Sequence, residues 1–200
     1  MPYRFFCLNK FDKLVDAIYE AKEKIVISGF LVKLKVYMSE KLIPTNEWLA
    51  VILVSGIAGT AVMTLCIYVL NQITKQVMSV TKILGTMITC ETTDDGKLSD
   101  SKFSIVAGVA AHYAIGILFA YGYHLLWSAG VGAPDFWNGL LLGFVSGIFA
   151  VIFWFTFFAV HPFPPQIELK SHLPTLFITH FVFASVTVAS YVFFSGKLLG

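Results

Sequence analysis

Long apolar stretches without charged residues dominate the hydropathy pattern of this 200-residue chain. Four of them are long enough to cross a bilayer as helices, because a span needs about 20 predominantly apolar residues. They cover roughly residues 48–70, 104–127, 137–160 and 173–195, and none contains Lys, Arg, Asp or Glu. The pattern predicts an all-α fold, an integral membrane four-helix bundle formed by one domain at residues 48–200.

Residues 1–47 show a different pattern, in which charged and apolar side chains alternate. Apolar positions recur there at helical spacing, as at Phe11, Leu14 and Ile18. The apolar run at 25–38 is about 14 residues long, too short for a span. We interpret the region as one or two amphipathic helices, which lie on the membrane surface or pack against a partner subunit.

Shorter signals divide the rest of the chain. Residues 71–89 carry apolar positions at helical intervals and predict a second interfacial helix, or a bent continuation of the first span. A polar turn follows at 90–102. Asp135 is a good cap for the third span, and the prolines after His161 end that span. The fourth span is expected to tolerate Pro174 in its first turn.

The composition supports a membrane protein. Hydrophobic residues make up 57% of the chain and charged residues 13%, whereas soluble domains carry about 25% charged residues. The net charge of +2 gives no sign of nucleic-acid binding. The amino terminus lacks the order of a signal peptide, so the first span is expected to act as the anchor. Cys7, Cys66 and Cys90 fall before, inside and beyond that span, which makes an internal disulfide unexpected.

The distribution of basic residues predicts the orientation. Eight Lys or Arg residues precede Trp48, and Lys197 adds another on the same side of the membrane. The opposite side carries five: Lys75, Lys82, Lys97, Lys102 and Lys170. Because cytoplasmic loops carry the excess of Lys and Arg, both termini are expected in the cytoplasm. Trp48, Trp127 and Trp137 fall on that same side, as in an aromatic belt.

The second span contains a ladder of small residues and histidines with a spacing of four. Its members are Gly108, His112, Gly116, Ala120 and His124. Such spacing places side chains near one face of a helix. Small residues permit close helix approach, and ionisable residues in a membrane normally face protein or water. The ladder therefore predicts that this helix forms the inner wall of the bundle.

His112 and His180 are predicted at matching depths. They lie eight and seven residues into the second and fourth spans, which run in the same direction. At 1.5 Å per residue, both would be roughly 10–12 Å below the extracytoplasmic surface. They are therefore able to face each other in the core. His161 and His172 are expected near the mouth on that side, and His124 near the other side.

Three interpretations of the histidines remain open. In the first, His112 and His180 are hydrogen-bonded packing residues. In the second, they are the axial ligands of a b-type haem, with Gly108, Gly116 and Ala184 leaving room for the macrocycle. In the third, His112, His180 and His161 form a metal or proton site at the extracytoplasmic side. The third lacks the spacing of a zinc motif and any carboxylate within the spans.

Glycines mark further packing surfaces. Gly139, Gly143 and Gly147 form a doubled GxxxG ladder in the third span, and Gly56 and Gly59 belong to a small-residue patch in the first. The ladder is expected to be satisfied inside the chain or by a second copy. Sequence motifs for dinucleotide binding, phosphate binding and nucleophilic catalysis are absent, which favours a protein without enzymatic activity.

Several segments together show a family resemblance. They are SGIAGTAVM in the first span, HYAIGILFAYGY in the second and THFVFASVTVASY in the fourth. The pattern over about residues 48–195 resembles the YagU-like group of small four-span bacterial inner-membrane proteins of unknown function. His112 and His180 match its histidine positions, and residues 1–47 lie outside it. The resemblance implies a multi-pass protein of the bacterial inner membrane, and it implies no reaction.

These observations favour a non-enzymatic membrane protein that acts as a small subunit or accessory of a larger assembly. Its expected partners are the lipid bilayer and other membrane subunits or a second copy, and not nucleic acid. The alternatives are a haem-binding electron carrier and a metal or proton site. Transport is less favoured, because the sequence shows neither an inverted repeat nor a broken helix.

Overall fold

A computed structural model describes residues 44–74, 79–162 and 164–198. The chain divides into two units, Met1–Pro44 and Thr45–Gly200, and the description that follows concerns the second. Most of the predicted amphipathic segment at 1–47 therefore lies outside the described residues. Its role on the membrane or on a partner stays a prediction.

Five α-helices and no strand make up the described part of the chain. They are α2 (Asn46–Thr74), α3 (Val80–Thr89), α4 (Lys102–Ser128), α5 (Phe136–Val160) and α6 (Leu169–Leu198). All except α3 are long and apolar enough to cross a membrane. The predicted all-α fold with four spans is confirmed, and each span extends by up to four residues beyond the predicted bounds.

Local polar contacts define the helix ends. The N–H of Asn138 donates to Oδ1 of Asp135 at 2.9 Å, which confirms Asp135 as the cap of α5. The start of α6 differs from the prediction. The N–H groups of Ser171 and His172 already donate to the carbonyl of Glu168, so helical bonding begins before the predicted span. Pro174 therefore lies inside α6 and beyond its first turn, and that prediction was wrong.

Residues 80–89 form a helix of their own, separate from α2. Ser79 caps α3, and its hydroxyl accepts from the N–H of Lys82 at 3.3 Å. Cys90 ends the helix in the left-handed conformation, with φ 55°. Six of its residues are buried: Val80, Ile83, Leu84, Gly85, Thr86 and Met87. The helix therefore packs into the protein, mainly against α4, and its position relative to the membrane surface stays a prediction.

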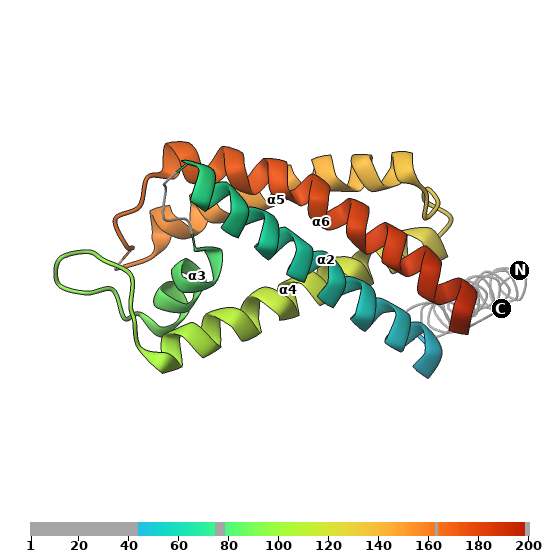
Figure 1. Ribbon diagram of the computed structural model, residues 1–200, viewed down its shortest axis with the longest axis horizontal. Coiled ribbons are helices and arrows are strands. Elements are labelled where there is room, and N and C mark those ends of the chain that lie inside the picture. Colours follow the sequence, from blue (N-terminus) through green and yellow to red (C-terminus); the bar gives the residue numbers. More distant parts are fainter. Residues whose placement is uncertain (1–43, 75–78, 163, 199–200) are drawn as a thin grey trace, which may run out of the picture. The chain divides into compact units, whose positions relative to one another are not determined.

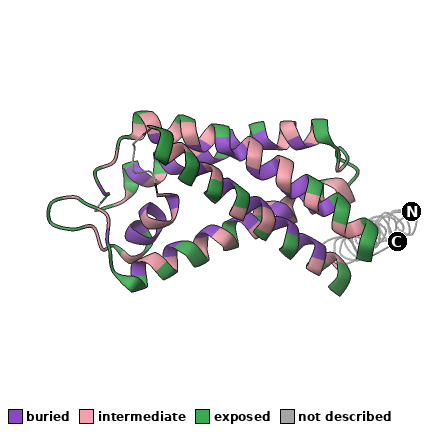
Figure 2. Cartoon of the chain, viewed as in Figure 1, coloured by how far each residue is buried: buried purple, intermediate pink, exposed green. Residues whose placement is uncertain are grey.

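The four long helices pack in the order α4–α2–α6–α5. The most extensive contacts join α2 to α6 and α6 to α5, and α2 also packs against α4. Figure 1 shows α2 crossing between α6 and α4, with α5 beside α6. Among the described helices, α5 packs extensively only against α6. Buried positions lie on the sides where the helices meet (Figure 2).

Glycines lie at these three contacts between the long helices and at the contact between α3 and α4. A Cβ at Gly56 of α2 would come within 2.7 Å of the Cα of Ile117 in α4. A Cβ at Gly143 of α5 would come within 2.8 Å of the Cα of Phe181 in α6. Gly59 lies against Thr187 and Phe183, Gly108 against Thr81, Gly116 against Thr60, Gly139 against Val188 and Gly147 against Phe177. These close approaches are made within the chain.

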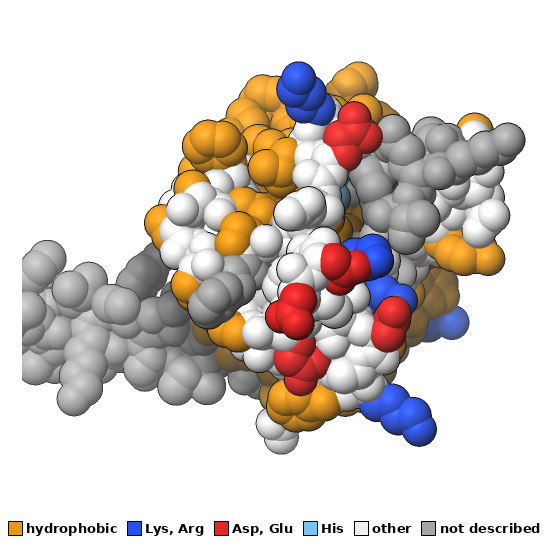
Figure 3. Space-filling model, turned by 90° about the vertical axis from the view of Figure 1, so that its left-hand side faces the viewer, with side chains coloured by type: hydrophobic (Ala, Val, Ile, Leu, Met, Phe, Trp, Pro, Cys, Tyr) orange, Lys and Arg blue, Asp and Glu red, His pale blue; other side chains and the backbone are white. Residues whose placement is uncertain are grey.

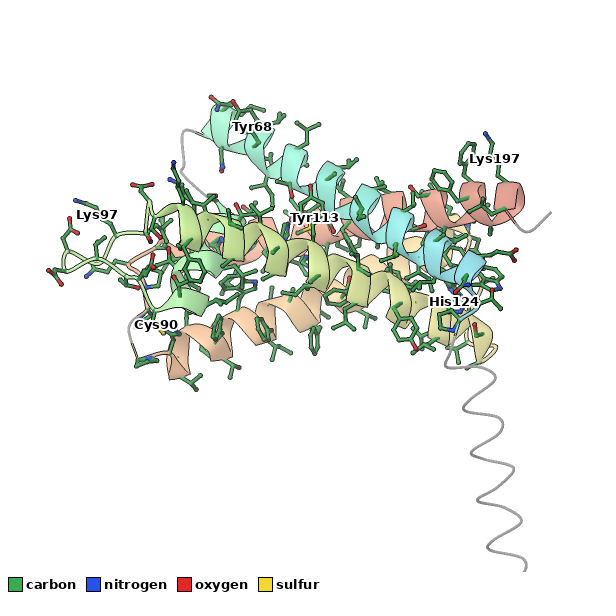
Figure 4. All side chains as sticks on the ribbon, turned by 90° about the horizontal axis from the view of Figure 1, so that it is seen from below. Tyr68, Cys90, Lys97, Tyr113, His124 and Lys197 are labelled. Atoms are coloured by element: carbon green, nitrogen blue, oxygen red, sulfur yellow. The ribbon has the colours of Figure 1, made fainter. Side chains whose placement is uncertain are left out.

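Two ends of the four-span unit are distinguished by their connections. The long-loop end contains residues 90–101 and 161–168, and the short-loop end contains residue 45, residues 129–135 and residue 198. Lys97 and His124 lie at these opposite ends in Figure 4. Acidic and basic side chains gather on the long-loop end (Figure 3).

Candidate functional site: a histidine pair and an adjoining cleft

The buried face of α4 is the one that its spacing of four predicts. Gly108, His112, Gly116, Ala120 and His124 are all buried, together with Ser104 and Tyr123. Because α4 contacts α2 on this face, the side chain of His112 is held between helices. It is only 8% exposed.

A hydroxyl of α2 determines the tautomer of His112. The Thr64 hydroxyl donates its single hydrogen to the carbonyl of Thr60 at 2.7 Å. Its oxygen lies 3.2 Å from Nε2 of His112, so it accepts from the Nε2–H group. The neutral His112 ring therefore carries no hydrogen on Nδ1. That nitrogen makes no hydrogen bond within the described part of the chain and is not fully enclosed.

His180 of α6 has the opposite tautomer. Its Nδ1–H group donates to the carbonyl of Leu176 at 2.7 Å, which leaves Nε2 without a hydrogen. His180 is 6% exposed. Its ring centroid lies 6.1 Å from that of Phe119 and 6.2 Å from that of Phe183. Nε2 likewise has no hydrogen-bond partner among the described residues and is not fully enclosed.

His180 of α6 lies beside Phe119 of α4, with ring centroids 6.1 Å apart. That His112 and His180 face each other in the core stays a prediction. Each neutral ring offers one basic nitrogen, which is able to accept a proton or a hydrogen bond from a small ligand.

A cleft of about 160 Å³ lies beside His112, between α2, α3 and α4. It is lined by Thr64, Ile67, Tyr68, Asn71, Ser79, Val80, Thr81 and His112. Six of these eight side chains carry a polar group. Tyr68, which lines the cleft from α2, is labelled in Figure 4.

Thr64 and Asn71 line the cleft but are not among the candidate site residues that the sequence predicts. A signal was present, because Thr60, Thr64 and Asn71 follow one another at offsets of four and seven, which is the spacing of one helix face. Helical spacing does not predict Ser79 and Thr81 as lining residues. They line the cleft because α3 packs beside α2 and α4, which the sequence pattern does not specify.

The cleft does not fit a haem. Pockets that hold cofactor-sized ligands have volumes of about 300–1,000 Å³, well above the 160 Å³ found here. His180 is not among the lining residues, and Nε2 of His112 is already bonded to Thr64. This cleft is therefore not a haem site, and a haem held by His112 and His180 stays a prediction.

The other histidines have separate surroundings. His161 donates from Nε2 to the carbonyl of Met87 at 2.8 Å, and Sγ of Cys90 is 3.8 Å from the same nitrogen. His172 is 2% exposed beside Trp154, and its Nε2 has no hydrogen-bond partner among the residues that the structure describes. Over the described ranges, no group of three His, Cys, Asp or Glu side chains is placed to hold a metal ion. A metal site formed by His112, His161 and His180 stays a prediction.

His124 belongs to an aromatic cluster at the short-loop end. Its Nδ1 is 2.8 Å from the hydroxyl of Tyr191, and the Ser128 hydroxyl lies 3.4 Å from its Nε2. The ring centroids of Trp48 and Trp127 lie 5.6 and 4.6 Å from the ring centroid of Tyr191. This cluster joins the start of α2 to the ends of α4 and α6.

The long-loop end is organised around Glu91. Hydrogen bonds donated by the hydroxyls of Ser101 and Ser99 lower the pKa of Glu91 below its ordinary value. Ser101 also caps α4 by accepting from the N–H of Ser104 at 3.1 Å. Beside this loop, Lys82 of α3 forms an ion pair with Asp100, whose pKa it lowers.

Comparison with known proteins provides no assignment. No known family model matches the chain, no curated protein matches it, and no solved structure matches it. The fold and the four apolar helices have the architecture of a multi-pass membrane protein. Membership of the YagU-like group stays a prediction.

Proposed function

We propose that this protein is a non-enzymatic accessory subunit of a larger membrane assembly. We further propose a bacterial inner membrane as its location, with both termini in the cytoplasm. The resemblance to the YagU-like group supports the membrane, and the excess of Lys and Arg supports the orientation. Lipid and other membrane subunits are the partners in this proposal.

The outer face of α5 is the observation that carries the proposal. This helix packs extensively against α6 alone among the described helices, through its glycine-bearing side. The opposite side exposes an apolar stripe, Leu141, Val145, Ile148, Ile152 and Phe155, and it is flanked by the exposed rings of Phe144, Phe149 and Phe153. The spacing alternates between four and three residues, which is typical of a seam between packed helices. A helix of another subunit is therefore the occupant that this stripe suits.

Photo-crosslinking in the native membrane tests the proposal. A photoreactive amino acid replaces Ile152 in the stripe, and the matched control carries it at Leu65 of α2. Both positions are 60% exposed. We expect Ile152 to yield one adduct with a defined membrane protein, because a seam holds its partner in fixed register. Leu65 should yield lipid adducts.

Two results would contradict the accessory role. Lipid adducts alone at both positions would make the stripe an ordinary lipid-facing surface. An adduct of two copies of this chain at Ile152 would assign the stripe to self-association. A native mass measurement in mild detergent then separates a mixed assembly from a homodimer.

A further inference from the structure

The carboxyl ends of α3 and α5 meet at the long-loop end of the protein. Cys90 and His161 are the C-cap residues of these two helices, and Sγ of Cys90 lies 3.8 Å from Nε2 of His161. The carbonyl oxygen of Met87, in the last turn of α3, lies 2.8 Å from this nitrogen and 3.7 Å from the sulfur. One sulfur, one nitrogen and one oxygen therefore form a small triangle of donor atoms. Cys90 is exposed there and is labelled in Figure 4.

The size of this triangle fits a single zinc ion. Zinc lies about 2.3 Å from a thiolate sulfur and about 2.0–2.2 Å from an imidazole nitrogen or an oxygen, so at the tetrahedral angle the sulfur is roughly 3.5–3.7 Å from each of the other two atoms. The two distances from Sγ are 3.8 and 3.7 Å. The nitrogen and the oxygen are 2.8 Å apart because a hydrogen bond joins them. They need to separate by about 0.6 Å to reach the same geometry around an ion.

The chemistry of the three donor atoms also favours zinc. Zn²⁺ is a borderline-soft ion that accepts sulfur, nitrogen and oxygen ligands and has no geometric preference of its own. Ca²⁺ and Mg²⁺ take oxygen ligands instead. The third donor is a backbone atom, and Cys90 and His161 are 71 residues apart in the chain. The spacing of side chains in the sequence therefore does not reveal this set.

Two helix ends give the triangle a negative electrostatic potential. The carboxyl end of a helix carries a partial charge of about −0.5, which stabilises cations, and both α3 and α5 end here. Glu91 directly follows Cys90, and the hydroxyls of Ser101 and Ser99 hold the pKa of Glu91 below its ordinary value. Its carboxylate is therefore ionised at neutral pH. The surroundings of the three donor atoms favour a cation.

We propose that Cys90, His161 and the Met87 carbonyl bind one Zn²⁺ ion, which links α3 to α5. The thiol releases its proton to the solvent when the sulfur binds the ion. His161 binds as the tautomer that carries its hydrogen on Nδ1, and the Met87 carbonyl exchanges its hydrogen bond for the metal. Water takes the fourth position, because the exposed thiol opens the site to solvent. The inference does not depend on the accessory role proposed above.

The link joins two parts of the four-span unit. Among the described helices, α5 packs extensively only against α6, and α3 packs mainly against α4. An ion between the ends of α3 and α5 therefore connects the α4 side of the unit to the α6 side at the long-loop end. The site is in this sense a stabilising metal site.

Cobalt binding tests the ligands. The parent for the test is the full chain with Cys7→Ser and Cys66→Ser, which keeps Cys90 as its one thiol. It is titrated in detergent with Co²⁺ and then with Zn²⁺, in the presence of a reductant that contains no thiol. We expect one Co²⁺ per chain and a thiolate-to-metal charge-transfer band, which Zn²⁺ abolishes by displacing the cobalt.

The matched control carries Cys7→Ser and Cys90→Ser, so that its one thiol is Cys66 of α2. It should show no charge-transfer band. Absence of the band in the parent would overturn the site, and so would an equal band in the control.

Two variants of the parent separate metal binding from a structural role of Cys90. Cys90→Ser removes the sulfur and should weaken Zn²⁺ binding by about 100-fold or more, since even residues that only orient metal ligands contribute about 10–100-fold. Cys90→His supplies a nitrogen, and histidine tolerates the left-handed backbone at this position, with φ 55°. It should retain Zn²⁺ and lose the charge-transfer band of Co²⁺. Unchanged Zn²⁺ affinity in Cys90→Ser would overturn the proposal.

Hydrogen exchange tests the link between the helices. At a Zn²⁺ concentration 100 times the dissociation constant, exchange through openings that break the site should slow by about 100-fold. We expect this slowing in the last turns of both α3 and α5, and none in Cys90→Ser. Zinc binding without slower exchange in both helices would overturn the link.

Discussion

Nε2 of His112 and the hydroxyl of Thr64 are 3.2 Å apart, and they join α4 to α2 in the middle of the four-span unit. Since Thr64 uses its own hydrogen on the Thr60 carbonyl, the imidazole is the donor. One hydroxyl thus orients the ring and leaves Nδ1 as its basic nitrogen. Both properties depend on the first span, although the histidine lies in the second.

We expect Thr64→Val to destabilise the protein by about 0.5–2 kcal/mol, the range of hydrogen bonds between membrane helices. The substitution keeps the shape of the side chain and leaves the Nε2–H of His112 without an acceptor. The free energy of unfolding in bicelles, measured by steric trapping, gives the magnitude. Ring ¹⁵N shifts should show a mixture of tautomers.

Thr64→Ser is the matched control for that prediction, because it retains the hydroxyl and removes only a methyl group. It should preserve the single tautomer of His112. If Val and Ser give the same tautomer populations, the Thr64 hydroxyl does not determine the state of the ring.

Gly108→Ala tests the contact between α3 and α4. The added Cβ would overlap the carbonyl oxygen of Thr81 and lie 2.7 Å from the N of Gly85. These are backbone atoms, so they cannot move aside as a flexible side chain would. We expect a loss of about 1–3 kcal/mol in unfolding free energy, as is typical of overpacking, together with faster hydrogen exchange in α3.

Gly122→Ala in the same helix is the control, because nothing lies within 4 Å of its added Cβ. Alanine is favoured over glycine in a helix by about 0.5–1 kcal/mol, so this variant should be as stable as the parent or more stable. Equal losses in the two variants would mean that α3 does not approach α4 at Gly108.

The sequence was sufficient to locate the four spans and the buried side of α4. Length and the absence of charge define a span, and the small residues at Gly108, Gly116 and Ala120 mark where another helix approaches. The pattern also identified Asp135 as a cap. These features depend on residues close together in the chain, which is why periodicity reveals them.

Periodicity does not predict contacts between residues that are far apart in the chain. The rotation of α2 places Thr64 against His112, and in a helix that is apolar on all sides the hydrophobic pattern does not specify rotation. The burial of α3 was missed because its apolar side suits a membrane surface as well as a protein neighbour. The early start of α6 follows from the position of Glu168, whose carbonyl accepts the first helical hydrogen bonds.

Glu91 predicts an acid-sensitive long loop. Hydrogen bonds from Ser101 and Ser99 lower its pKa in the folded protein. The stabilisation is therefore fully present above the ordinary Glu pKa of about 4.3, and it is lost as the pH falls through the lower pKa of the folded state. We expect hydrogen exchange of the N–H groups at 99–101 to accelerate over that acidic range, relative to the intrinsic exchange rate.

Glu91→Gln should remove this pH dependence, because the amide does not titrate. Asp94→Asn is the control in the same loop, since Asp94 makes no hydrogen bond or ion pair with the part of the chain described. An unchanged pH profile in Glu91→Gln would show that another group controls the loop.

Tyr191 joins α6 to α4 at the short-loop end, and Tyr191→Phe tests this junction. The variant removes the hydroxyl that lies 2.8 Å from Nδ1 of His124 and keeps the ring that packs against Trp48 and Trp127. We expect a loss of about 0.5–2 kcal/mol in unfolding free energy, with a change in tryptophan fluorescence. Tyr113→Phe is the control, because the Tyr113 hydroxyl has no hydrogen-bond partner among the described residues. If the two variants lose equal stability, the bond between His124 and Tyr191 does not hold this end of the bundle together.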